Sequence, residues 1–116
     1  MSRQRNKRSA ARRSVPALLF AALGDKTRLA LVSKLLSGEP ASIAQLTVGS
    51  RITRQAVTKH LRVLQHAGIV RGIRAGREHR FALEPNSIEE MQHYLDSVSR
   101  QWDTALARLK SFVEAR

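Results

Sequence analysis

Apolar residues recur with helical spacing in the middle of the chain. Val57, Leu61 and Leu64 follow the i, i+4, i+7 pattern that places side chains on one face of a helix. Thr53 is a suitable N-cap, and Gly68 stands where a left-handed residue commonly ends a helix. The pattern predicts one amphipathic helix with a single buried face.

Two helices are predicted near the start of the chain. Pro16 can open the first, over the nearly all-apolar run 17–23. Asp25 can cap the second, and Gly38 can end it. The inner stripe of this second helix is expected to consist of Leu29, Val32, Leu35 and Leu36.

A short third helix is predicted between Ser42 and Val48, because Ser42 and Gln45 have the spacing of a capping box. Together with the helix after Thr53 it forms a helix-turn-helix pattern. Two strands, 69–74 and 78–83, are expected next, joined by the tip Ala75-Gly76-Arg77. This hairpin is typical of a wing.

The longest predicted helix covers about 88–115 and is introduced by a second capping box, Ser87 to Glu90. Its apolar residues step by 4 and 3, as in a coiled-coil seam. This stripe packs either on its own domain or against a second copy. We expect a second copy, because the helix is too long for so small a core. The expected interface residues are Leu18, Leu19, Met91, Leu95, Val98, Trp102, Leu106, Leu109 and Phe112.

The predicted fold is mainly α with a small β-hairpin, in the order α-α-α-α-β-β-α. It is a winged helix-turn-helix domain over residues 15–116, dimerising through its first and last helices. Residues 1–14 are expected to be a disordered basic tail. This tail is either a solubilising extension or an arm that touches DNA.

The net charge of +12 favours a polyanionic partner. Residues 1–14 contain six basic residues and no acidic one, and residues 40–83 contain eight basic residues and only Glu78 as an acid. Residues 84–116 carry a net charge of −2. The positive charge is therefore concentrated on the tail and on the helix-turn-helix and wing.

Several functional classes are disfavoured by composition. There is no cysteine, which excludes disulfides and thiolate metal sites. No apolar run reaches the ~18 residues of a membrane span, and the basic start lacks the features of a secretory signal. No nucleophile arrangement, phosphate-binding loop or carboxylate dyad indicates an enzyme. A cytoplasmic, non-enzymatic protein is expected.

The polar face of the helix after Thr53 carries side chains that can bind DNA bases and phosphates. The expected base-reading residues are Arg54, Gln55 and Thr58. The expected contacts to the DNA backbone are Thr53, Lys59, Arg62 and Arg51. On the wing the candidates are Arg74, Arg77 and His79; Arg77 either enters the minor groove or stays in solvent.

Three segments, Leu23–Arg28, Gln55–Leu64 and Ala67–Val70, occur in an order that resembles the arsenical-repressor (ArsR) family of winged helix-turn-helix repressors. The late residues Trp102 and Leu106 resemble a branch that lacks a metal site. The resemblance implies a homodimer in which the first and last helices pair across a two-fold axis. Its two recognition helices would enter successive major grooves, with the wings beside them. The resemblance also implies a repressor that leaves DNA when a ligand binds.

The metal sites of that family are not matched. The cysteines of its founding members are absent, and His93 and Asp96 have no second histidine after them. We interpret this pair as solvated and expect no metal or cofactor. His60 is expected to pack beneath its helix, although a phosphate contact is the alternative.

The sequence thus favours a homodimeric, sequence-specific repressor acting on double-stranded DNA at an inverted repeat, with an unidentified inducer and no membrane partner. The alternatives are a basic structural or RNA-binding protein and a metal-responsive sensor. RNA readers usually stack bases on exposed aromatic residues, and the chain is only 4% aromatic.

Overall fold

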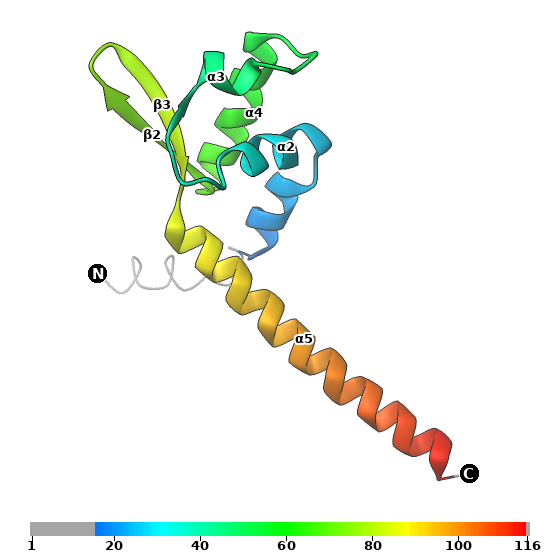
Figure 1. Cartoon of the computed structure of the whole chain (residues 1–116). Helices are drawn as coiled ribbons and strands as arrows, with labels where there is room; N and C mark the ends of the chain where they lie inside the picture. Colours follow the sequence, from blue (N-terminus) through cyan, green and yellow to red (C-terminus); the bar gives the residue numbers. More distant parts are fainter. Residues whose placement is uncertain (1–15, 116) are drawn as a thin grey trace, which may run out of the picture.

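The computed structural model describes residues 16–115 of the 116, so the predicted basic tail 1–14 lies outside the described part. It confirms the predicted winged helix-turn-helix fold (Figure 1). A first helix covers residues 16–23. The remaining elements are α2 (Lys26–Lys34), β1 (Ala41–Ser42), α3 (Ile43–Thr47), α4 (Arg54–His66), β2 (Val70–Ala75), β3 (Glu78–Leu83) and α5 (Pro85–Glu114).

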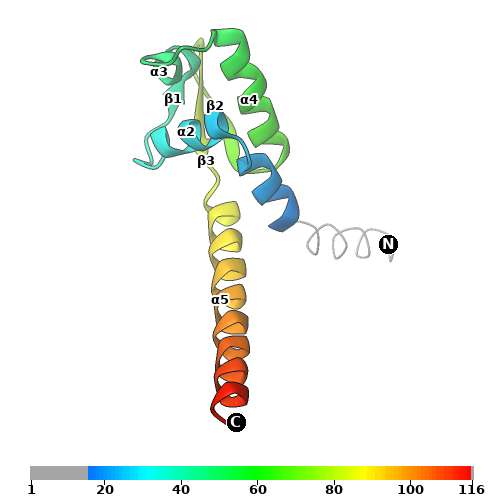
Figure 2. The same cartoon turned by 90° about the vertical axis from the view of Figure 1, so that its right-hand side faces the viewer.

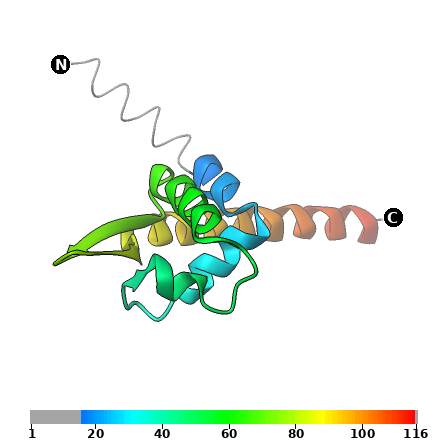
Figure 3. The same cartoon turned by 90° about the horizontal axis from the view of Figure 1, so that it is seen from above.

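The elements form two regions, which we call the head (residues 16–91) and the distal α5 (residues 92–114). In the head, the helices and the sheet surround one hydrophobic core. The distal α5 continues as a straight rod away from the head, as Figure 2 shows from the side and Figure 3 from above.

The core joins residues from the first helix, every later helix and the wing. Its fully buried members include Leu19, Leu35, Leu46, Val57, Leu61, Leu64 and Ile69. The predicted stripe of α2 was partly wrong. Leu29 and Leu36 are exposed, whereas Leu31 is buried with Leu35, because the i, i+4 pair Leu31 and Leu35 forms the face that joins the core.

Two residues expected at a subunit interface lie in the core of the same chain. Leu19 is fully buried and Met91 is 8% exposed. Both pack in the cluster that also contains α4. The head uses the near ends of both helices to complete its own core, and a role for these two residues at a dimer interface stays a prediction.

The sheet has three antiparallel strands in the order β1-β3-β2. The hairpin was predicted, but β1 was not, because two residues are too few to show alternation. Ala41 of β1 pairs with Phe81 of β3, and Ser42 pairs with Arg80. The hairpin turns at Gly76 and Arg77, and the positive φ of Gly76 (65°) suits the first position of a tight two-residue loop.

The start of α5 also differs from the prediction. The helix begins at Pro85, and no side chain bonds to its N-terminal N–H groups at the Glu84 cap. Proline is tolerated there because its missing N–H is not needed in the first turn. The predicted capping box at Ser87 was wrong, since Ser87 Oγ donates a hydrogen bond to the carbonyl of Gly68. This bond ties α5 to the end of α4.

Candidate nucleic-acid interface

Helix α4 separates a buried face from an exposed polar face. Val57, Leu61 and Leu64 are at most 1% exposed. Thr53 caps the helix as predicted, with its Oγ1 accepting a hydrogen bond from the N–H of Ala56 at 3.1 Å. The first turn contains no acidic residue, so the positive end of the helix dipole is not neutralised locally. This end is suited to an anion such as a phosphate.

The polar face of α4 presents three cations and an amide to solvent. Arg54, Gln55, Lys59 and Arg62 are all exposed. Arg and Gln side chains can each form paired hydrogen bonds with base edges in the major groove, whereas Lys binds phosphate as a point charge. The geometry is therefore compatible with base reading by Arg54 and Gln55, which stays a prediction.

Thr58 is placed differently from the other candidate base-reading residues. It is half-buried, and its Oγ1 donates a hydrogen bond to the carbonyl of Arg54 at 2.8 Å. A hydroxyl in this arrangement can still accept a hydrogen bond, but it cannot donate one without breaking its bond to the backbone. Thr58 is thus the weakest of the three candidates.

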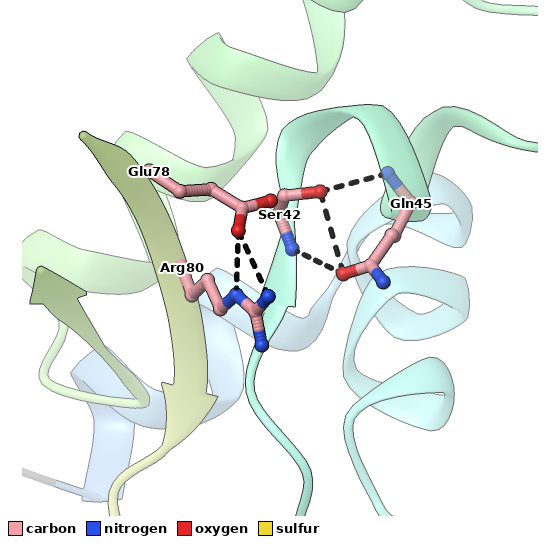
Figure 4. A network of polar contacts seen from close by, with 4 residues as sticks. All are labelled: Ser42, Gln45, Glu78 and Arg80. Atoms are coloured by element: carbon pink, nitrogen blue, oxygen red, sulfur yellow. Dashed lines mark hydrogen bonds and ion pairs between the residues drawn. The ribbon is translucent and has the colours of Figure 1, made fainter. Parts of the chain in front are cut away.

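Helix α3 lies against α4 and is fixed by the predicted capping box (Figure 4). Gln45 N–H donates to Ser42 Oγ at 3.2 Å, and Ser42 N–H donates to Gln45 Oε1 at 2.9 Å. Ser42 is 7% exposed and also pairs with β3. The box therefore connects α3 to the wing. Arg51 is exposed in the turn that leads into α4.

The wing places two arginines at the edge of the same region. Arg74 and Arg77 are exposed, and Arg74 pairs across the strands with His79. The hairpin tip and the N-terminal end of α4 both lie at the end of the head that is remote from α5 (Figures 1 and 2). A duplex lying across this end could meet α4 and the wing together.

His79 is less available than its two neighbours on the wing. Its ring packs on Phe81, with ring centroids 4.7 Å apart, although the residue as a whole is exposed. We therefore expect His79 to stabilise the wing surface, with a DNA contact as its secondary role.

An ion pair on β3 was not anticipated from the sequence. The Nε and one terminal nitrogen of Arg80 donate to Glu78 Oε2 at 3.0 and 2.8 Å (Figure 4). The spacing i, i+2 on one strand face was the signal that could have revealed it. Glu78 is the single acid between residues 40 and 83, and its carboxylate is engaged by Arg80.

Other kinds of site find little support in the described part of the chain. Between residues 16 and 115 no three His, Asp or Glu side chains come together as metal ligands. His93 and Asp96 are both exposed on α5. Among the described helices, none combines the length and hydropathy needed to cross a bilayer.

Comparisons with known proteins agree with this geometry. A family described as a helix-turn-helix domain matches residues 23–73. Over 100 residues the chain is 31% identical to the HTH-type transcriptional regulator Rv2034 of Mycobacterium tuberculosis, a match that covers 86% of this chain and 90% of that protein.

Two solved structures extend the likeness to most of the fold. An ArsR-like transcriptional regulator from Rhodococcus sp. RHA1 matches with a TM-score of 0.74 at 31% identity, over 85% of this chain and 92% of that one. Another ArsR family transcriptional regulator matches with a TM-score of 0.68 at 26% identity, over 78% of this chain and 92% of that one.

Proposed function

The chain belongs to the ArsR family of winged helix-turn-helix transcriptional regulators, and we propose that it is a homodimeric transcriptional repressor that binds DNA sequence-specifically. Its target is an inverted-repeat operator. The observation that carries the proposal is the polar face of α4, where Arg54, Gln55 and Lys59 are exposed beside a helix N-terminus without acidic residues. Bases are read from such a face in the major groove, while the wing arginines contact the flanking backbone or minor groove.

The distal α5 supports the proposed homodimer. Leu95, Trp102, Leu106 and Leu109 each keep more than half of their surface exposed. Near the head, an apolar groove of about 450 Å³ runs between the first helix and α5 and is lined by Phe20, Leu23, Ile88, Met91, Gln92, Leu95 and Asp96. Leu18, on the first helix, is 57% exposed. A second copy that covers the seam of α5 and the groove would remove this apolar surface from water.

A two-fold axis through the paired α5 helices sets the form of the operator. Two α4 helices related by this axis would enter the major groove at half-sites about 34 Å apart. One α4 contacts too few base pairs to select a site in a genome, so specificity depends on the dimer. In the proposed role the dimer blocks transcription in the cytoplasm, needs no catalysis, and is released by an unidentified inducer.

The alternative of an RNA-binding protein is less well supported by the placement of the aromatic residues. Tyr94 and Trp102 are exposed, but both lie on α5, away from the basic face of α4. RNA readers bring stacking aromatics and cations together in one site. The basic face here combines cations with an amide, which suits the edges of paired bases.

Selection from a pool of random double-stranded DNA with the full-length protein tests the proposal. We expect enrichment of an inverted repeat, with affinity for it at least ~10³-fold above that for random duplex at physiological salt. A structured RNA of equal length, titrated at two salt concentrations, is the control. An RNA bound more tightly than the selected duplex, or a pool without a consensus, would refute the proposed function.

A further inference from the structure

The guanidinium of Arg28, on α2, contacts two other helices of the same chain. Its Nε donates a hydrogen bond to the carbonyl of Ala22, at the end of the first helix. One terminal nitrogen lies 3.3 Å from Nδ1 of His60 on α4. Because arginine stays protonated and can only donate, His60 Nδ1 accepts in this arrangement. One side chain thus connects three helices: the first, α2 and α4.

Asp25 completes this connection from the start of α2. Its Oδ1 accepts a hydrogen bond from the N–H of Arg28 at 3.0 Å and lies 3.9 Å from Nδ1 of His60. The bond from the Arg28 N–H, with help from the charge of the Arg28 guanidinium, lowers the pKa of Asp25 below its ordinary value. The guanidinium of Arg28 and the carboxylate of Asp25 therefore both lie within 4 Å of Nδ1 of His60.

Lys34, at the other end of α2, holds the other helix of the helix-turn-helix. Its Nζ donates to the carbonyls of Leu46 and Val48 at 2.9 and 3.1 Å. Both carbonyls are at the C-terminal end of α3, where backbone acceptors have no partner within the helix. The lysine replaces those partners and fixes the end of α3 just before the turn into α4.

We infer that Arg28 and Lys34 are positioning residues for operator recognition, which orient α4 and α3 on α2 without contacting DNA themselves. This inference rests on the proposed DNA-binding function. Base reading requires side chains to be held in a narrow range of positions, whereas binding to phosphates tolerates small rotations of the helix. Loss of either positioning residue is therefore expected to reduce the preference for the operator more than the affinity for random DNA.

Two other roles for these cations give different results. A phosphate contact would contribute to the salt dependence of binding, and its removal would flatten that slope by about one unit. A purely stabilising contact would lower the melting temperature and leave the operator preference of the folded protein unchanged. The ratio of operator to random affinity, together with the salt slope, separates all three roles.

The experiment uses full-length Arg28→Lys, which keeps the charge but lacks the planar fork that reaches Ala22 and His60 together. At a temperature where melting shows the variant to be folded, we expect at least tenfold weaker operator binding. Affinity for random duplex and the salt slope should stay within experimental error. Lys26→Gln is the matched control, because Lys26 is an exposed cation on the same helix, and it should leave the preference unchanged.

A double-mutant cycle tests the contact with His60. If Arg28 acts through His60, Arg28→Lys combined with His60→Ala should weaken operator binding no more than about twofold beyond Arg28→Lys alone. Should Arg28→Lys be unfolded at the assay temperature, Lys34→Gln replaces it under the same criteria. An unchanged operator preference in the folded variants, or a flatter salt slope, would overturn the inference. A wild-type protein without operator preference would refute the proposed function, and the inference with it.

Discussion

The head and the distal α5 carry similar apolar periodicity with opposite outcomes. In the head, the i, i+4, i+7 stripe of α4 is buried, as Val57 and Leu61 show. In the distal α5, an equally regular stripe leaves Trp102 63% exposed and Leu109 59% exposed. Periodicity therefore identifies the apolar face of a helix. It does not reveal whether the surface that covers this face belongs to the same chain.

The length of α5 explains the difference. A 30-residue helix is about 45 Å long, and only its first turns meet the head, where Met91 is buried and Ile88 packs against the core. Beyond residue 98 every described side chain is exposed. The head thus encloses a core of its own, whereas the apolar stripe of the distal α5 stays exposed within one chain.

The largest expected effect comes from Trp102→Ala. If a second copy buries the indole, the lost contact costs about 3–5 kcal/mol, and the dimer should dissociate at micromolar concentration. Operator affinity should fall by about 100-fold or more, because a monomer reads one half-site. Gel-shift titration measures this loss. Gln101→Ala, which changes an exposed polar neighbour, is the control and should bind like wild type.

A substitution in the core of the head should destabilise the protein regardless of protein concentration, unlike Trp102→Ala. Leu61→Ala removes a side chain that is 1% exposed and should lower the free energy of unfolding by about 2–5 kcal/mol. The loss should appear in urea unfolding at every protein concentration. Trp102→Ala should instead change the unfolding midpoint only where wild type is dimeric. If the unfolding midpoints of the two variants depended equally on protein concentration, the distinction between the head and the distal α5 would not hold.

Two further variants, Gln55→Ala and Lys59→Ala, change the exposed face of α4 without affecting the core or α5. Gln55→Ala should cost ~1–3 kcal/mol on the operator and little on random DNA, since an amide can bond specifically to adenine. Lys59→Ala should weaken both and reduce the salt slope by about one unit. Fluorescence anisotropy at several salt concentrations measures both effects. Equal losses on the two DNAs for Gln55→Ala would exclude base reading.

The smallest expected effect is a change in how the stability of the head depends on pH. The bond from the Arg28 N–H holds the pKa of Asp25 below its ordinary value of 3.8. The carboxylate therefore stabilises the head fully above that value, and this contribution is lost as the pH falls through the lowered pKa. Asp25→Asn should lose less stability than wild type between pH 6 and pH 2, in thermal melts of both proteins. Parallel pH profiles would contradict this role.

Much of the fold could be predicted because its signals are local. The caps at Thr53 and Ser42, the stripe of α4 and the glycine at the hairpin tip each depend on a few neighbouring residues. The errors occurred where distant contacts decide. Ser87 bonds to Gly68 in place of capping α5, and the two-residue β1 exists only because β3 pairs with it.

The candidate site was predicted only in part for the same reason. The exposed face of α4 follows from its period, so Arg54 and Gln55 could be placed from the sequence. The half-buried position of Thr58 could not, because its hydroxyl turns back to the carbonyl of Arg54. The contact between Arg28 and His60 joins residues 32 positions apart, and no local pattern indicates it.

Sedimentation equilibrium of the wild-type protein, from sub-micromolar to tens of micromolar concentration, tests the central claim most directly. The account predicts a dimer of twice 13.0 kDa at micromolar concentration, with Trp102→Ala sedimenting as a folded monomer. A wild-type protein that remains monomeric throughout this range would contradict the assignment of the distal α5 as an interface, and the inverted-repeat operator with it.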